Sequence, residues 1–326
     1  MVLLSILSIP FIAAIILLFV KHNEKANYIA IASTGITLAL ALNIAFNGAA
    51  NFDASWISSF NARFVLTADG LAKILLLLTG ISFPAIFIAT SKNEIKNRAQ
   101  FLSLMLFTQT GLLGVFLAGD ALLFYFFWEL ALIPVYFLCS IWGGEKRIAV
   151  TFKFFIYTFL GSLFMLIGII LVYTHTADQS FAIQSFKEAN LNFGQQLTAF
   201  ALFFTAFAIK MPIFPLHTWQ PDTYEQSPTA VTMVLSAVMV KMGLYGVMRW
   251  LMPLFPDAFA AHSNFVVILS VIGILYASFI AIRQDDMKRL IAYSSIAHIG
   301  LMSAALFSNT EIGVQGVLIQ LFSQYV

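Results

Sequence analysis

Residues 201–217 read ALFFTAFAIKMPIFPLH and place one lysine near the end of an apolar segment, directly before two prolines. A proline has no amide hydrogen to donate, so Pro212 and Pro215 each free a carbonyl group one helical turn earlier, which for Pro212 is that of Ala208. The sequence therefore predicts a helix that breaks just after Lys210. An ionisable side chain at such a break inside a bilayer marks a candidate functional site. The alternative is a lysine that snorkels toward the end of its helix.

The composition is that of a polytopic membrane protein. Of 326 residues, 60% are hydrophobic and only 10% are charged, whereas soluble proteins carry about 25% charged residues. The formal net charge of +2 gives no basis for nucleic-acid binding. The single cysteine, Cys139, excludes an intrachain disulfide, a cysteine zinc site and an iron–sulfur cluster held by this chain alone. We interpret Cys139 as a packing residue.

Apolar segments long enough to cross a bilayer, about 20 residues each, recur along the whole chain. The first lacks the basic start and the cleavage pattern of a signal peptide, so we interpret it as a transmembrane helix. The expected spans are residues 2–20, 28–46, 68–90, 100–118, 121–141, 149–174, 194–216, 228–250, 264–282 and 290–308. An eleventh segment begins near residue 311 and is short for a span. We therefore expect the sequence to be a truncated version of a longer chain.

Basic residues in the connections predict the orientation, because loops rich in Lys and Arg stay on the cytoplasmic side. With the N-terminus outside, the inner side would hold Lys21, Lys25, Lys92, Lys96, Arg98, Lys146, Arg147, Arg283, Lys288 and Arg289. The outer side would hold Arg63, Lys187 and Arg249. This bias predicts an outside N-terminus, with the long polar connections 47–67 and 174–193 on the outer side.

Three charged residues remain well inside the expected spans: Glu129, Lys210 and Lys241. An unpaired charge at the centre of a bilayer costs at least about 2.5–3.5 kcal/mol, so such residues face the interior of a helix bundle and pair. We expect Glu129 to pair with Lys210. For each residue the alternative is a purely structural partner on a neighbouring helix. No proline lies between Val231 and Trp250, so we expect an undistorted helix around Lys241.

Several further polar residues are weaker candidates. A lone histidine such as His298 fits either a proton relay or a hydrogen-bonded interior position. Lys153, near the start of its span, is interpreted as a snorkelling lysine. The polar turn after the predicted break either lines an inlet from the inner side or is a solvated loop, and it carries His217, Asp222 and Glu225.

The sequence lacks GxGxxG, a Walker loop, CxxCH and paired histidines within one span. Nucleotide, flavin and haem binding therefore have no support, and we expect no cofactor and no metal in this chain. Buried lysines, a glutamate and a histidine without a redox or metal centre indicate movement of protons or cations.

Four motifs carry a resemblance to a known family. They are FWELALIPVYFL at 127–138, KFFIYT at 153–158, IKMPIFPLHTWQPDTYEQSPTA at 209–230 and DMKRLIAYSSIAHIG at 286–300. They resemble the antiporter-like membrane subunits of respiratory complex I, most closely the M type of bacterial NADH:quinone oxidoreductase. The likeness runs from about residue 60 onward.

The resemblance implies an all-α, polytopic transmembrane helical bundle with two inverted five-helix repeats, each containing a broken helix. Residues 1–99 would form the first three transmembrane helices and residues 100–250 the first antiporter-like repeat. Residues 251–326 would begin a second repeat, which is incomplete in this sequence. Where the family continues with a histidine in the eleventh helix this chain has Gln324, so we expect the truncated chain to be inactive alone.

The resemblance also implies a proton path driven by quinone reduction elsewhere in the complex, with no redox centre in this chain. Glu129, Lys210, Lys241 and His298 match the family's proton-transfer residues. The implied partners are the other membrane subunits of complex I and the lipid bilayer, without nucleic acid, in the bacterial inner (plasma) membrane. The alternative is a subunit of a multisubunit cation/proton antiporter or of a membrane-bound hydrogenase of the same superfamily.

Overall fold

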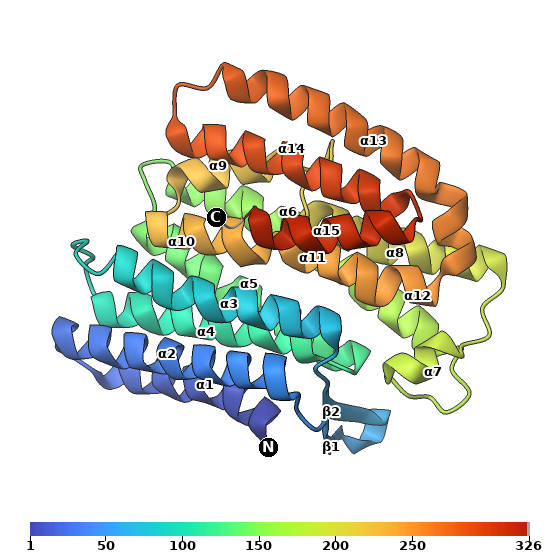
Figure 1. Ribbon diagram of the computed structural model, residues 1–326, viewed down its shortest axis with the longest axis horizontal. Coiled ribbons are helices and arrows are strands. Elements are labelled where there is room, and N and C mark those ends of the chain that lie inside the picture. The colour runs from blue at the N-terminus through green and yellow to red at the C-terminus, as the bar shows by residue number, and fades with distance from the viewer. Residues whose placement is uncertain (325–326) are drawn as a thin grey trace. The chain divides into compact units, whose positions relative to one another are not determined.

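The structure is a computed structural model that describes residues 1–324 and is predominantly helical (Figure 1). The helices are α1 (Val2–Phe19), α2 (Asn23–Asn47), α3 (Gly70–Ala89), α4 (Arg98–Leu117), α5 (Ala121–Trp142), α6 (Arg147–Tyr173), α7 (Ile183–Lys187), α8 (Phe193–Lys210), α9 (Trp219–Gln226), α10 (Thr229–Val234), α11 (Lys241–Gly246), α12 (Met252–Leu254), α13 (Pro256–Ile282), α14 (Met287–Phe307) and α15 (Glu311–Ser323). The two strands are β1 (Phe52–Ile57) and β2 (Ala62–Leu66), with a short 3-10 turn between them at Ser58–Phe60.

Among the described residues, nine helices are long and apolar enough to cross a membrane. One of them, Thr229–Leu254, is a continuous helix that includes α10, α11 and α12 together with two π-helical turns. The nine helices confirm the predicted all-helical membrane fold. The expected span at 194–216 is shorter than predicted, because α8 ends at Lys210.

The chain forms two compact units. The first contains Met1–Arg147, Ser180–Ile183 and Ser227–Val238, and the second contains the remaining described residues. The division into residues 1–99, 100–250 and 251–326, which rests on the family's repeats, stays a prediction.

In the first unit, α4 is the central helix and packs against α1, α2, α3 and α5 (Figure 1). Most of its residues are buried. Two glycines let α5 approach it closely. A Cβ atom added at Gly111 would lie 2.5 Å from the backbone nitrogen of Ala131, and one added at Gly114 would lie 2.1 Å from the ring of Phe127. Larger residues at these positions would force the two helices apart.

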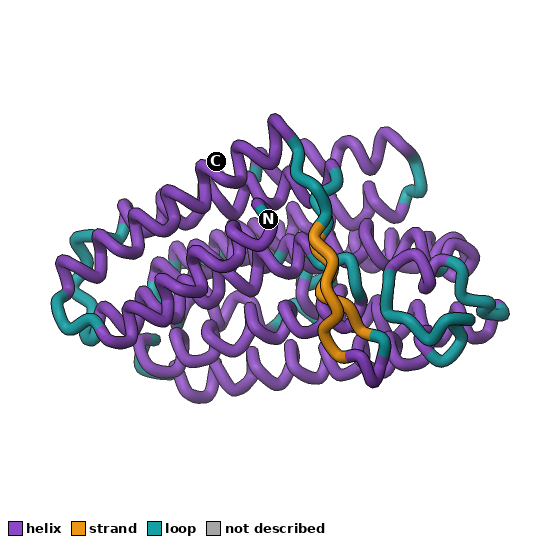
Figure 2. Tube along the Cα trace, turned by 90° about the horizontal axis from the view of Figure 1, so that it is seen from below, coloured by secondary structure: helices purple, strands orange, loops and turns teal. Residues whose placement is uncertain are grey.

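The connection at 47–67, expected as a polar loop, forms an antiparallel hairpin in which Phe52 pairs with Leu66. Figure 2 shows the two strands in orange, lying side by side along the hairpin. Asp120 ties the hairpin to the start of α5, because its carboxylate accepts hydrogen bonds from the backbone amides of Arg63, Leu122 and Leu123. Burial raises the pKa of Asp120, and the three amide donors oppose that rise.

In the second unit, α14 packs against α13, α9 and α15, while α8 packs against α11 and α13. Helix α6 approaches α8 through glycines. A Cβ atom at Gly161 would lie 3.1 Å from the side chain of Ile209, and one at Gly168 would lie 2.8 Å from the ring of Phe203. Small residues of this kind permit close helix packing in lipid, where packing drives helix association.

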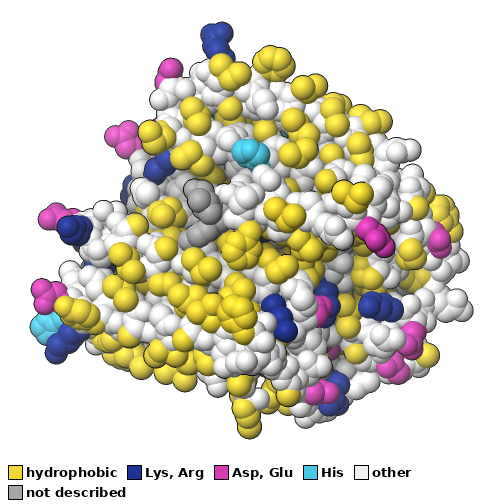
Figure 3. Space-filling model, in the orientation of Figure 1, with side chains coloured by type: hydrophobic (Ala, Val, Ile, Leu, Met, Phe, Trp, Pro, Cys, Tyr) yellow, Lys and Arg dark blue, Asp and Glu magenta, His cyan; other side chains and the backbone are white. Residues whose placement is uncertain are grey.

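The outward faces of the helices are apolar. Figure 3 shows hydrophobic side chains over much of one face, with the charged side chains mostly toward the edges of the view. Large apolar side chains with most of their surface exposed include Ile88 at 61%, Phe279 at 70% and Ile319 at 72%. Exposed apolar surface on this scale fits contact with lipid or with other membrane proteins.

Candidate functional site

The helix that carries Lys210 breaks where the two prolines predict, and the carbonyl groups near the break are satisfied inside the protein. The last helical hydrogen bond of α8 runs from the amide of Met211 to the carbonyl of Phe207, 2.8 Å away. The carbonyl of Ala208, freed by Pro212, accepts from the amide of Ile213 at 3.0 Å. The predicted break after Lys210 is confirmed.

An indole group from the next helix also stabilises the break. Trp219, the first residue of α9, donates its Nε1–H to the carbonyl of Ile209 at 2.9 Å. Trp219 is fully buried and packs on the ring of Phe154 in α6, with 5.1 Å between ring centroids. The hydrogen bond and the ring contact of Trp219 therefore link the backbone beside Lys210 to α9 and α6. The sequence contained no signal for this pairing, because a buried tryptophan is also an ordinary core residue.

Lys210 is 1% exposed and lies at the C-terminal end of α8. The C-terminus of a helix carries partial negative charge, which favours a cation at that point. Lys241 is completely buried and begins α11. Both lysines therefore occupy interior positions, as the sequence predicted.

The helix around Lys241 is not the undistorted helix that the sequence predicted. It widens into π-helical turns at Leu235–Met239 and at Val247–Leu251, one on each side of α11. A π turn accommodates an extra residue without any proline, so it leaves no signature in composition. Such turns occur often at functional sites.

Two glycines bring the helix of Lys241 against the break that follows Lys210. A Cβ atom at Gly243 would lie 2.7 Å from the Cβ atom of Met211 and 2.8 Å from the carbonyl oxygen of Phe207. The backbone of α11 thus touches the last turn of α8. This contact places the two lysine-bearing segments side by side within the second unit.

The same methionine also meets α14. The hydroxyl group of Ser303 donates to the Sδ atom of Met211 across 3.9 Å. His298 lies on α14 as well, about one and a half turns before Ser303, and its side chain is exposed. The structure therefore brings the helix of His298 to the break without burying His298 itself.

Glu129 lies in α5, within the first unit, and is partly buried. Lys210 belongs to the second unit. Their pairing stays a prediction.

The polar turn after the break is built into the protein and does not form a loose solvated loop. His217 is buried, stacks on Phe214 at 5.6 Å between ring centroids and meets the ring of Tyr276 edge-on at 5.2 Å. Burial, with a smaller contribution from the positive charge of Lys153, lowers the pKa of His217. Both effects favour the neutral form of the imidazole.

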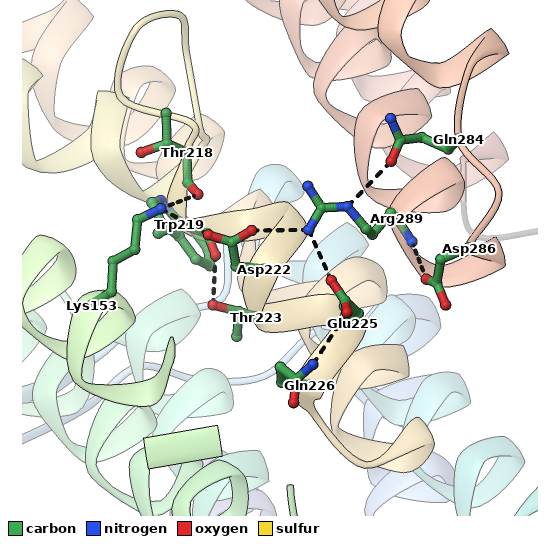
Figure 4. Close-up of polar contacts among 10 residues, drawn as sticks. All are labelled: Lys153, Thr218, Trp219, Asp222, Thr223, Glu225, Gln226, Gln284, Asp286 and Arg289. Atoms are coloured by element: carbon green, nitrogen blue, oxygen red, sulfur yellow. Dashed lines mark hydrogen bonds and ion pairs between the residues drawn. The ribbon is translucent and has the colours of Figure 1, made fainter. Parts of the chain in front are cut away.

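Two carboxylates of the turn bind cations. Asp222 binds the ammonium group of Lys153 at 2.8 Å and the guanidinium group of Arg289 at 3.0 Å, and Glu225 binds the same guanidinium group at 2.8 Å (Figure 4). Lys153 thus has a carboxylate partner, which its interpretation as a snorkelling lysine did not include. Sequence spacing gave no hint of this cluster, because its members come from three separate helices.

No group of three or more His, Cys, Asp or Glu residues within residues 1–324 could hold a metal ion. Cys139 is buried and lies 3.2 Å from the hydroxyl group of Ser227, which fits a packing role.

Comparison with known proteins identifies the family. Residues 118–326 match the family described as "NADH:quinone oxidoreductase/Mrp antiporter, TM". NADH-quinone oxidoreductase subunit M of Rhodobacter capsulatus is 36% identical over 98% of this chain and 67% of the relative. The chain belongs to this family. The Escherichia coli (strain K12) subunit M is 37% identical over 91% of this chain and 62% of that protein.

Solved structures agree with this family assignment. The chain superimposes on a chain of respiratory complex I from Thermus thermophilus with bound NADH, with a TM-score of 0.91, 28% identity and coverage of 100% of this chain and 68% of that chain. A chain of the Mrp complex from Dietzia sp. DQ12-45-1b shares the fold, with a TM-score of 0.87 and 22% identity over 100% of this chain and 36% of that chain. The resemblance found in the motifs is confirmed. This chain spans about two thirds of the length of the curated relatives.

Proposed function

We propose that this chain is a proton-translocating membrane subunit of a NADH:quinone oxidoreductase. The observation that carries the proposal is the junction of two buried lysines. Lys210 ends a broken helix, and Gly243 brings the helix of Lys241 against that break. Two buried ammonium groups on touching segments have a high cost in a bilayer, so a functional role explains their presence better than packing does.

In the proposed mechanism, Lys210 holds a proton while Glu129 lies beside it. When an incoming proton or a movement in a neighbouring subunit weakens that pair, Lys210 releases its proton toward Lys241 and then His298. The π turns beside Lys241 support this path, because a widened helix leaves backbone groups that can bind water. Quinone reduction, which drives the transfer, would take place in other subunits.

The partners in this proposal are the other antiporter-like membrane subunits of the complex. The location is the bacterial inner membrane, with the N-terminus outside. The names of the curated relatives support the complex, and the distribution of basic residues supports the orientation.

Two substitutions of Lys241 test the relay. Lys241→Ala removes the titrating group, whereas Lys241→Arg keeps the positive charge but scarcely releases a proton. We expect both variants to lower proton pumping per assembled complex in membrane vesicles, together with quinone reduction. A structural cation would be replaced well by arginine, so full pumping by Lys241→Arg with normal assembly would contradict the proposal for this residue.

A second candidate function is a chain of a multisubunit cation/proton antiporter. The family description covers both functions, and the Mrp complex shares the fold. Copurification with NADH dehydrogenase subunits would support the first candidate. Loss of growth in high sodium on deletion of the gene, with NADH oxidation unchanged, would support the second.

A further inference from the structure

A compact cluster of ion pairs holds α9, the short helix that follows the break. Asp222 and Glu225 of α9 bind two cations, Lys153 near the start of α6 and Arg289 near the start of α14 (Figure 4). The four charges sum to zero, and all four residues belong to the second unit. The cluster therefore joins three helices at one end of that unit.

Arg289 differs from Lys153 in how it binds. Its Nη1 atom alone contacts both carboxylates, Asp222 at 3.0 Å and Glu225 at 2.8 Å. These carboxylates lie three residues apart on α9 and so share one face of the helix. The guanidinium group is also oriented by the side chain of Gln284, which accepts from its Nε atom at 3.2 Å. One side chain of α14 thus binds α9 at two points.

The ion pairs are too exposed to act mainly by adding stability. The side chains are between 29% and 36% exposed, and ion pairs that water reaches contribute little each because water screens them. A set of directed contacts to one rigid group can still fix the position of a short helix. This geometry therefore fixes the position of α9 more than it raises the stability of the protein.

Helix α9 transmits its position to the backbone beside Lys210. Its first residue, Trp219, donates to the carbonyl of Ile209, which immediately precedes Lys210. Lys153 donates to the carbonyl of Thr218, the residue before Trp219, at 2.9 Å. A displacement of α9 would therefore disturb the last turn of α8.

We propose that Arg289 is a positioning residue for Lys210: by binding Asp222 and Glu225 together, it holds α9 against α14 and, through Trp219, fixes the end of the broken helix. This inference rests on the proposed function for its effect on pumping, but not for its effect on α9. Because His298 lies on the same helix as Arg289, a movement of α14 would act on the first and last members of the proposed path together.

A cysteine-labelling experiment tests the hold on α9 without measuring transport. Thr223 is 1% exposed on α9, so a cysteine placed there should label slowly with a maleimide while α9 is held. The native Cys139 is 3% exposed, so background labelling should be slow as well. We would place Thr223→Cys in the assembled complex in native membranes and compare Arg289→Gln with the parent. Loss of both carboxylate contacts should raise the labelling rate about tenfold, the size expected when two partly exposed ion pairs are lost. Arg289→Lys should restore part of the protection.

Arg283→Gln is the matched control. Arg283 is exposed in the same connection between α13 and α14, and it is not a member of the ion-pair cluster that holds α9. It should change neither labelling nor pumping. Glu225→Gln, which removes one carboxylate charge and so weakens only one of the two contacts, serves as a milder variant if Arg289→Gln fails to assemble, and it should raise labelling by a smaller factor.

The two readouts separate the inference from the proposed function. Faster labelling with reduced pumping per assembled complex in Arg289→Gln would support the inference. Unchanged labelling would overturn it whatever the pumping rate. Faster labelling with normal pumping would show that α9 is held by Arg289 but does not position Lys210, which also overturns it. Normal pumping after loss of Lys241 itself would count against the proposed function and would leave the labelling result intact.

Discussion

Replacing Gly246 with alanine should destabilise the contact between the lysine-bearing helices. A Cβ atom at Gly246 would lie 2.4 Å from Cε1 of Phe207 and 2.7 Å from two further atoms of the same ring. Carbon atoms in contact normally lie about 3.5–4.0 Å apart. The ring must therefore move by about 1 Å, yet Phe207 is completely buried and packs on Phe203 with 6.0 Å between centroids.

The expected size follows from two opposing effects. Overpacking a buried site costs about 1–3 kcal/mol, while exchanging glycine for alanine within a helix gains about 0.5–1 kcal/mol. We expect Gly246→Ala to lower the free energy of unfolding by about 1–2 kcal/mol. Gly35→Ala in α2 is the matched control, because a Cβ atom there meets nothing within 4 Å.

The measurement is unfolding of the purified protein in mixed micelles, followed during titration with a denaturing detergent. Gly35→Ala should be neutral or slightly stabilising. A smaller ring-free side chain should relieve the clash, so Phe207→Leu combined with Gly246→Ala should lose less stability than the sum of the two single changes. Equal stability of Gly246→Ala and the control, or simple additivity in the double variant, would refute the reasoning.

Three further predictions follow from other parts of the chain. In a full-length chain, Glu129→Gln keeps size and hydrogen bonding but removes the charge that would hold the proton on Lys210. Pumping and quinone reduction per assembled complex should therefore fall strongly, and Glu129→Asp should be milder. Near-normal pumping in vesicles by an assembled Gln variant would favour a structural role. Asp120→Ala removes the acceptor for three backbone amides where the hairpin meets the start of α5. It should lower the free energy of unfolding by about 1–2 kcal/mol in the same titration, whereas Asp120→Asn should retain most of that stability. Equal losses of stability in the two variants would argue against the cap. A reporter fused after Lys96 should give a cytoplasmic signal, and a periplasmic signal there would reverse the predicted orientation.

Local chemistry allowed much of this protein to be predicted. Hydropathy over windows of about 20 residues located the membrane helices. Pro212 located the end of α8 because the loss of an amide donor acts within one helical turn. The charges within spans identified Lys210 and Lys241 as interior residues, because exposure of a charge to lipid has a high cost wherever the helix lies. Each of these inferences depends only on neighbouring residues or on the solvent.

The partners of these groups could not be predicted in the same way. Asp222 meets Lys153 and Arg289 across 69 and 67 residues of chain, and nothing in the local pattern distinguishes these cations from solvated ones. The π turns around Lys241 leave no mark in composition, and the hairpin at 47–67 forms in a stretch that reads as a polar loop.

The sequence by itself determined that this is a helical membrane protein with a broken helix and buried lysines. Only the tertiary structure decided that Trp219 secures the break, that Gly243 brings the second lysine helix against it and that Arg289 binds the helix that follows. The physical reason is one of range. Hydropathy and backbone chemistry act on adjacent residues, whereas hydrogen bonds, ion pairs and close packing depend on which distant helices meet and in which register.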